Sequence, residues 1–255
     1  MKLFELTPVV RLHHHLFTLA YHAHEAELEL IAGLPGKARK ISSSWPDHAA
    51  LGLDIGAGTG PYGRKLLAQC DHVVLVEPNG EQAAYLRRAF GSRAHVVEAA
   101  AGGAAGTALL VDDAGDGWRR PLARLADETQ KEAGWQQVCR VETMDTIAAR
   151  LGLLQLTGAL IAKIDVEGTE LAVLQGMSRL LADRPALLII EIEVRLNPAY
   201  AEIFALLARA GFACYVYKGG ELHPGDPGMA ADMAGRTPGR FGRLSGYRSN
   251  FVFLR

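Results

Sequence analysis

Short apolar runs alternate with amphipathic segments along most of the chain. Runs rich in β-branched residues predict strands, and segments with apolar residues three and four positions apart predict helices. This alternation is typical of an α/β fold, with a doubly wound, mostly parallel sheet of about seven strands. We expect the last strand to be antiparallel, because it follows a hairpin-like return. The predicted strands are 51–55, 72–76, 94–98, 159–165, 186–192, 212–217 and 249–254. The predicted helices are 61–70, 80–90, 143–152, 168–182 and 198–210.

Three segments do not follow this alternation. Residues 1–45 are predicted to form an N-terminal helical cap, followed by one domain over 46–255. Residues 102–140 are rich in Gly and Ala and then mixed, so we expect a crossover with an irregular insertion. Residues 218–248 are rich in Gly and Pro and are predicted to be an irregular loop or lid. A loop of that length in a compact domain is usually functional or disordered.

Composition narrows the class of protein. The 255 residues are 49% hydrophobic and 22% charged, as in a soluble globular protein. The net charge of −1 gives no electrostatic reason to expect a nucleic acid or a membrane as partner. Three scattered cysteines argue against a disulfide framework or a zinc site. The charged N-terminus lacks the apolar core of a signal peptide, and no apolar run is long enough to span a bilayer. We therefore expect a cytoplasmic protein.

A glycine loop follows the first predicted strand, in the sequence LDIGAGTGPYG. Gly56, Gly58 and Gly60 permit a sharp turn and a close approach of a ligand to the backbone. Pro61 is preorganised for the first turn of a helix. The third glycine arrives one residue too early for the dinucleotide fingerprint GxGxxG, and no GK[ST] of a P-loop follows. Beginning at Asp54, the pattern DxGxGxG resembles the first motif of class I S-adenosylmethionine (SAM) methyltransferases.

The second strand ends in VVLVEPN, which puts Glu77 at its tip, about twenty residues after Asp54. An acidic residue there can accept hydrogen bonds from both ribose hydroxyls of a cofactor. Taken alone, Glu77 could equally be a strand-end acid that caps the next helix. Together with Asp54 and the glycines it predicts SAM, whose sulfonium and amino groups are cationic. Glu98 and Ala99, at the end of the third strand, complete the predicted cofactor-binding set.

A group of carboxylates follows the strand 159–165 in the sequence AKIDVEGTEL. Ligands of doubly wound sheets bind at the C-terminal ends of the strands, and an alcohol that is methylated must lose its proton to a base. Asp165 is therefore the first candidate for a catalytic residue and Glu167 the second. Asp165 could instead hold SAM or water, and Glu167 with Gly168 could be the entry turn of the next helix. Glu170 is expected to serve the N-terminus of that helix.

Lys163 shares a face of its strand with Asp165, because side chains alternate along a strand. A buried lysine needs a partner, so we expect Lys163 to pair with Glu191 or Glu193 of the neighbouring strand. A divalent metal between Asp165 and Glu191 would suit hard oxygen ligands, but no metal site is predicted.

The 218–248 loop carries charged groups that could contact a substrate. His223 is expected on the active-site side. Arg236, Arg240, Arg243 and Arg248 could hold a phosphate or a carboxylate. A solvated flexible loop is the alternative interpretation.

The order of motifs resembles the FkbM family of SAM-dependent methyltransferases. The motifs are DIGAGTGPYG, VEP, VETMDTIAARLG, IAKIDVEGTELAVLQG, LLIIEIE and NFVF. The resemblance covers roughly 50–195 and the final strand. It implies a Rossmann-like methyltransferase sheet, SAM as cofactor, and O-methylation of a hydroxyl on a small metabolite or a sugar or glycan. Two alternatives remain: transfer to an amine, a carboxylate or RNA, and a SAM-binding protein that has lost catalysis. The absence of an NPPY-type motif argues against methylation of a base.

Overall fold

The computed structural model describes residues 33–112, 124–126, 135–233 and 249–255. Most of the predicted N-terminal cap lies outside these residues, and so do the arginines at 236–248. Within the described part of the cap, α3 (Leu34–Ile41) is a helix, as predicted.

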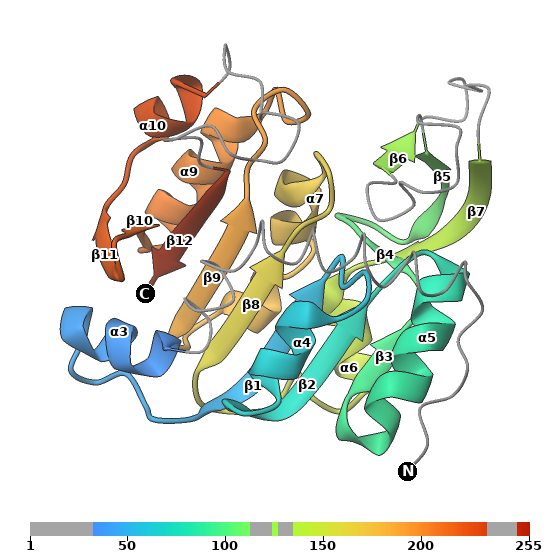
Figure 1. Ribbon diagram of the computed structural model, residues 1–255, viewed down its shortest axis with the longest axis horizontal. Helices are drawn as coiled ribbons and strands as arrows, with labels where there is room; N and C mark the ends of the chain where they lie inside the picture. Colours follow the sequence, from blue (N-terminus) through green and yellow to red (C-terminus); the bar gives the residue numbers. More distant parts are fainter. Residues whose placement is uncertain (1–32, 113–123, 127–134, 234–248) are drawn as a thin grey trace.

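The main sheet has eight strands in the order β11-β10-β12-β9-β8-β1-β2-β3 (Figure 1). Strand β8 pairs in parallel with β1 and β9, so the segment before Asp165 lies beside the first strand, as predicted. Strand β12 runs antiparallel to β9 and β10, which confirms the expected direction of the last strand. The bounds are β1 Ala49–Ile55, β2 Cys70–Val76, β3 His95–Val97, β8 Leu160–Ile164, β9 Ala186–Glu191, β10 Ala213–Lys218, β11 Glu221–Pro224 and β12 Asn250–Leu254.

The eighth strand, β11, lies in the segment that was predicted to be irregular throughout, and that prediction was wrong there. Gly219 and Gly220 both have positive φ, 60° and 88°, and connect β10 to β11 as a two-residue hairpin turn. A Gly-Gly pair is suited to this turn, because both central residues need positive φ. A short helix, α10 (Pro227–Ala231), follows the hairpin.

A second sheet of four strands, in the order β4-β7-β5-β6, replaces the irregular insertion expected over 102–140 (Figure 1). Its long members, β5 and β7, pair antiparallel from Gly106–Val141 to Asp112–Trp135. Ala100, Leu110 and Cys139 form a small buried cluster between its strands. The bounds are β4 Ala100–Ala101, β5 Gly106–Asp112, β6 Arg124–Ala126 and β7 Trp135–Glu142.

Helices cover both faces of the main sheet (Figure 1). Buried side chains of α3, α4 and α5 pack on one face, and those of α6, α7, α8 and α9 pack on the other. The bounds are α4 Pro61–Leu66, α5 Gly80–Phe90, the 3₁₀ helix η1 Gly91–Arg93, α6 Met144–Arg150, α7 Glu170–Gln175, α8 Ser178–Leu181 and α9 Tyr200–Arg209. None of the helices in the described ranges has both the length and the apolar character that crossing a bilayer requires.

The single helix predicted over 168–182 is in fact two helices, α7 and α8, separated at Gly176. A Cβ atom on Gly176 would lie 2.1 Å from the carbonyl oxygen of Gly102, so the chain there depends on a glycine. The carboxylate of Asp145 accepts hydrogen bonds from the backbone N–H groups of Arg179 and Leu180, each at 2.9 Å. Contacts with Gly102 and with Asp145 of α6 therefore break the helix. The spacing of apolar residues within 168–182 contains no information about these contacts.

Candidate active site

A pocket of about 550 Å³, part of it open to solvent, lies where β1, β2 and β8 end. This is the C-terminal edge of the parallel strands, where doubly wound sheets bind their ligands. The pocket is lined by Gly56, Gly58, Val76, Glu77, Pro78, Gln82, Ala99, Ala100, Ala101, Leu110, Asp165, Val166, Glu167 and Thr169.

The glycine loop forms one wall of the pocket and brings two strand ends together. Gly56, Gly58 and Gly60 have φ values of 79°, 55° and 76°, which side chains with a Cβ rarely adopt. A Cβ on Gly56 would lie 1.8 Å from the carbonyl oxygen of Asp165, so this glycine lets β1 and β8 end side by side. A Cβ on Gly60 would lie 2.7 Å from the ring of Phe90, outside the pocket. Gly60 therefore serves the packing of α5.

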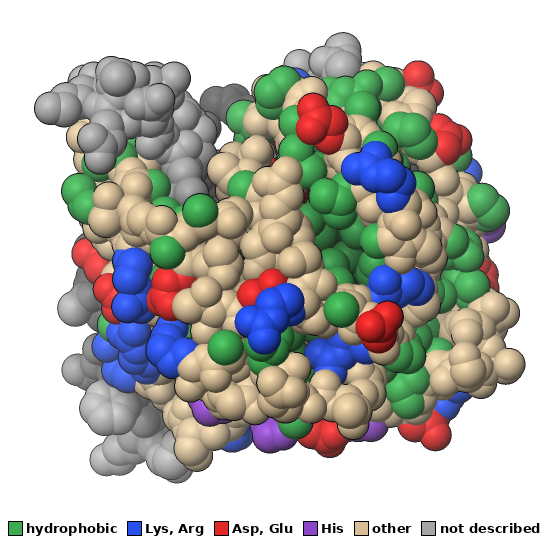
Figure 2. All heavy atoms as spheres, turned by 180° about the vertical axis from the view of Figure 1, so that it is seen from behind, with side chains coloured by type: hydrophobic (Ala, Val, Ile, Leu, Met, Phe, Trp, Pro, Cys, Tyr) green, Lys and Arg blue, Asp and Glu red, His purple; other side chains and the backbone are tan. Residues whose placement is uncertain are grey.

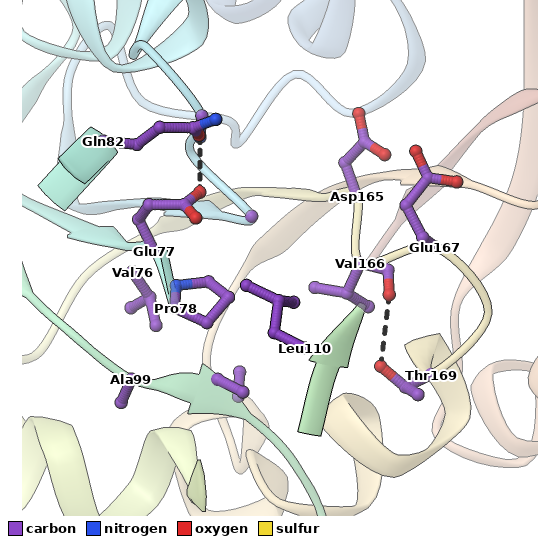
Figure 3. Close-up of a pocket in the computed structure, with 14 residues that line it drawn as sticks. Val76, Glu77, Pro78, Gln82, Ala99, Leu110, Asp165, Val166, Glu167 and Thr169 are labelled. Carbon is purple, nitrogen blue, oxygen red and sulfur yellow. Dashed lines mark hydrogen bonds between the residues drawn. The ribbon is translucent and has the colours of Figure 1, made fainter. Parts of the chain in front are cut away.

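Glu77 is buried at the end of β2, and its carboxylate is held by two backbone donors, of which Figure 3 marks one. Oε2 accepts a hydrogen bond from the N–H of Gly58 and Oε1 one from the N–H of Asn79, both at 2.8 Å. Burial raises the pKa of Glu77 to about 7, although the two hydrogen bonds oppose that shift. Each carboxylate oxygen can accept a second hydrogen bond. Glu77 can thus receive the hydroxyl groups of a ligand at a fixed position.

The structure places the other predicted cofactor residues in two groups. Ala99 lines the pocket beside Ala100 and Ala101, as Gly56, Gly58 and Glu77 do. Asp54 is completely buried beneath the loop, where its Oδ2 accepts a hydrogen bond of 2.8 Å from the N–H of Gly63 in α4. Burial raises the pKa of Asp54 to about 7.

Glu98 lies outside the pocket lining. Its Oε2 is 2.9 Å from Nη1 of Arg87 in an ion pair on the surface of α5. Asp54, Gly60 and Glu98 thus do not line the pocket. Asp54 instead anchors the start of α4 beneath the glycine loop, through its hydrogen bond with Gly63.

Asp165 and Glu167 form the wall opposite Glu77 (Figure 3). Beneath Asp165, the side chain of Lys163 is fully buried, with Nζ 3.3 Å from Oδ2 of Asp165 and 3.8 Å from Oε2 of Glu191. The prediction that Lys163 pairs with a glutamate of the next strand is confirmed for Glu191. Glu193 forms an ion pair of 2.9 Å with Arg195.

Glu167 has a φ of 54°, and the following Gly168 a φ of 106°, so the chain turns sharply here. Oε1 of Glu170, the first residue of α7, accepts hydrogen bonds from the N–H groups of Gly168 at 3.1 Å and Val166 at 3.4 Å. The predicted entry turn at Glu167 and Gly168 is thereby confirmed, and Glu170 lies in the first turn of α7, where it was expected. Burial and then the charge of Asp165 raise the pKa of Glu167 to about 8. Both causes favour the protonated form of Glu167, whose side chain lines the pocket.

Several pocket residues were missed from the sequence. Leu110 comes from β5 of the small sheet, in a segment expected to be irregular. Gln82 lies in the first turn of α5, four residues after Pro78, a position from which it could have been inferred. Thr169 follows Gly168, and its hydroxyl donates to the carbonyl oxygen of Val166 at 3.3 Å.

No group of three His, Cys, Asp or Glu side chains within the described ranges is arranged to hold a metal ion. Asp165 and Glu191, the pair considered for a metal, both face the ammonium group of Lys163. His223 is exposed on β11, and three strands separate β11 from β8 in the sheet. Strand β10 runs parallel to β8 and turns into β11 at the C-terminal edge of the sheet, but His223 does not line the pocket, so its contact with a substrate stays a prediction.

Comparisons with solved structures give three similar methyltransferases of low identity. The first is a methyltransferase FkbM from Methylobacillus flagellatus KT (12% identity, TM-score 0.46), with 84% of this chain and 46% of that chain covered. This chain thus spans about half the length of that protein. The second is a methyltransferase from Geobacter sulfurreducens (17% identity, TM-score 0.44), with 99% and 90% covered. The third is a SAM-dependent methyltransferase of the DUF858 family from Leishmania major (11% identity, TM-score 0.43), with 91% and 72% covered.

None of the curated proteins matches this sequence. The model of the methyltransferase FkbM domain matches residues 54–214, which include the glycine loop, Glu77 and the turn after β8. This match spans more than half of the chain, and the protein belongs to the FkbM family of methyltransferases.

Proposed function

We propose that the protein transfers the methyl group of SAM to a hydroxyl group of a small metabolite or sugar. Membership of the family supports methyl transfer. The observation that carries the proposal is the position of Glu77 and Asp165 on opposite walls of one pocket. In this proposal the carboxylate of Glu77 binds the methyl donor, and the carboxylate of Asp165 contacts the acceptor.

The residues of the pocket fit SAM. Both oxygens of Glu77 keep room for hydrogen bonds from the ribose hydroxyls, and the ionised carboxylate complements a cationic ligand. Gly56 and Gly58 present backbone without side chains, so a ligand can approach the loop closely. Ala99, Leu110 and their neighbours provide an apolar wall suited to an aromatic base.

SAM supplies a methyl group bonded to a sulfonium sulfur. An acceptor oxygen can attack the methyl carbon from the side opposite the sulfur. In the proposed reaction, Asp165 accepts a hydrogen bond from the acceptor hydroxyl and directs its lone pair toward the methyl group. Transfer would break the bond between the methyl carbon and the sulfur, leave S-adenosylhomocysteine as a neutral thioether, and form the new C–O bond, while the hydroxyl proton moves to the Asp165 carboxylate. In its protonated form, which burial favours, Glu167 donates a hydrogen bond to another oxygen of the acceptor. A pair of carboxyl groups in different protonation states suits a polyhydroxylated acceptor, whose groups both donate and accept.

We also propose that the acceptor is small and the protein cytoplasmic. Acidic and basic side chains are interspersed on the face of the molecule in Figure 2, whereas a nucleic-acid partner would favour a continuous basic surface. The cysteines Cys70, Cys139 and Cys214 are free thiols, which suits a reducing compartment.

A screen with methyl-labelled SAM tests the proposed reaction. The panel contains methyl glycosides of common hexoses, linear polyols, phenols, amino sugars and a short RNA, and mass spectrometry with NMR locates the transferred label. We expect a methyl ether on a hydroxylated acceptor. Label found on an amine, a carboxylate or a nucleobase would contradict the proposal.

The variant Asp165→Asn tests the role of the proposed base. Turnover should fall at least about 100-fold, in the range expected for loss of a general base, while the Kd of SAM by calorimetry changes less than about threefold. Glu193→Gln is the matched control, because Glu193 pairs with Arg195 and does not line the pocket. Full activity of Asp165→Asn would mean that Asp165 is structural.

A further inference from the structure

Lys163 is a lysine without exposed surface in β8, in the middle of the main sheet. We propose that Lys163 is a positioning residue of the methyl transfer, which keeps the carboxylate of Asp165 ionised and in place at the pocket wall. The inference rests on the proposed function, because it assumes that Asp165 acts as the base.

Four elements fix the ammonium group. Besides the carboxylates of Asp165 and Glu191, at 3.3 and 3.8 Å, Nζ donates a hydrogen bond of 3.0 Å to Oδ1 of Asn250 in β12. It also lies 5.2 Å from the centre of the Tyr62 ring in α4. Such contacts allow a cation to remain in the interior of a protein. The direction from which Lys163 reaches Asp165 is therefore set by three strands and a helix.

Stability alone does not account for a lysine at this position. Replacing a buried ion pair by apolar side chains of similar volume is often neutral or stabilising, and the neighbours of Lys163 along β8, Ala162 and Ile164, are apolar and buried. What a lysine adds is a charge, and that charge lies behind the carboxylate that faces the pocket. Its position therefore supports a role in the chemistry of Asp165.

Several acids lie near Asp165, which faces the pocket on its open side. The acids whose charges act on it come from β1, the end of β2, the turn after β8, α7 and β9: Asp54, Glu77, Glu167, Glu170 and Glu191. When it is ionised, each of them favours the protonated form of Asp165, which could not accept a proton from the acceptor. An opposite charge within 4–6 Å favours the ionised form by about one to three pH units. Lys163, at 3.3 Å, supplies that charge.

The titration of Asp165 tests the inference without any acceptor. The protein is labelled with ¹³C at the aspartate carboxyls, and the signal of Asp165 is assigned by its loss in Asp165→Asn. In Lys163→Met the midpoint of this titration should rise by at least about one pH unit, and in Lys163→Arg, which keeps the charge, by less than half of that. An unchanged midpoint in a folded Lys163→Met protein would overturn the inference.

A second variant keeps the test open if Lys163→Met does not fold. Glu191→Gln removes the charge of the second carboxylate near Lys163, at a partly exposed position. The ion pair of Lys163 with Asp165 then remains. The midpoint of Asp165 should then fall, and a midpoint that rises or stays constant would contradict the role of Lys163.

The reaction gives an independent measurement, with the hexose methyl glycoside that is methylated fastest in the screen. The acidic limb of the pH profile of kcat should move upward in Lys163→Met by the same interval as the titration, with the Kd of SAM changed less than about threefold. A uniform loss of kcat with an unmoved limb would show a merely structural role and overturn the inference. If no hydroxyl acceptor is methylated but the Asp165 midpoint moves as expected, the proposed function fails while the electrostatic role of Lys163 stands.

Discussion

The contact between Gly56 and Asp165 allows a sharp test of how the two walls of the pocket are joined. Gly56→Ala and Gly58→Ala form a matched pair, because both glycines have positive φ, 79° and 55°, and both line the pocket. They differ in what an added Cβ would meet. At Gly56 it would lie 1.8 Å from the carbonyl oxygen of Asp165, whereas at Gly58 the nearest atom is the flexible Gln82 Oε1 at 3.7 Å.

The expected cost follows from these distances. The left-handed conformation costs a residue with a Cβ about 1–2 kcal/mol, and Gly58→Ala should lose about that much. At Gly56 the end of β8 must also move by about 1.6 Å to restore a contact of 3.4 Å. Overpacking adds about 1–3 kcal/mol, and loss of the 2.9 Å hydrogen bond from the N–H of Asp165 to the carbonyl of Ile55 adds about 1 kcal/mol. Gly56→Ala should therefore be about 2–4 kcal/mol less stable than Gly58→Ala.

Urea unfolding followed by circular dichroism, at pH 7 and without SAM, measures this difference. Equal m values in the two variants would show that the midpoints report stability. In a thermal melt the same difference should appear as at least about 4 °C, since 1 kcal/mol shifts the Tm of a domain of this size by about 2–4 °C. If Gly56→Ala were no less stable than Gly58→Ala, the close approach of β1 and β8 would not depend on the glycine.

Three further predictions concern the buried carboxyl groups. Glu77→Gln should weaken SAM binding more than about tenfold by calorimetry, whereas Glu98→Gln, whose carboxylate faces Arg87, should change the Kd less than about twofold; equal losses would contradict the assignment. Because burial raises the pKa of Glu77 to about 7 and the ionised form is the better acceptor, SAM affinity should rise between pH 6 and 8, and a constant Kd would refute this. Burial also raises the pKa of Asp54 to about 7 and of Glu167 to about 8, so the folded state binds more protons than the unfolded chain. Their stabilising contribution is fully present below the unfolded pKa values of 3.8 and 4.5 and is lost as the pH rises to the folded values of about 7 and about 8, so urea unfolding of Asp54→Asn across this range should show a flatter decline than the wild type.

Local signals were sufficient to predict most of the main sheet and half of the pocket. Strand β1 with Asp54, the three glycines and Glu77 lie within one contiguous β-α-β unit, so their arrangement follows from the chain itself. The placement of Asp165 beside them required one further step, the rule that ligands bind at the ends of parallel strands. The register of β8 with β1 agrees with that rule.

The features of the fold and of the pocket that were not predicted from the sequence depend on contacts between distant segments of the chain. Gly176 breaks a helix because it packs against Gly102, which belongs to another part of the chain. Leu110 enters the pocket because β5 pairs with β7, across residues whose pattern of apolar positions is weak. Asp54 and Gly60 belong to a recognisable motif, yet neither lines the pocket. Asp54 accepts a hydrogen bond from the N–H of Gly63 in α4, and Gly60 packs against Phe90 of α5. A motif identifies a binding region, and packing determines which of its members face the ligand.

The chain segment that forms the small sheet begins and ends at neighbouring positions beside the main sheet. Ala100 pairs with Val141 and Ala101 with Glu142, and the N–H of Gly102 donates to the carbonyl of Glu142 at 3.0 Å. The segment between them can therefore be lengthened, shortened or replaced without displacing β8 or the glycine loop. The segment contributes Leu110 to the apolar wall proposed for the base of SAM, and Nε2 of Gln137 in β7 donates a hydrogen bond of 3.0 Å to the carbonyl of Pro78, next to Glu77. The exchange of one contiguous segment would therefore change the donor side of the pocket and leave the turn with Asp165 and Glu167 in place.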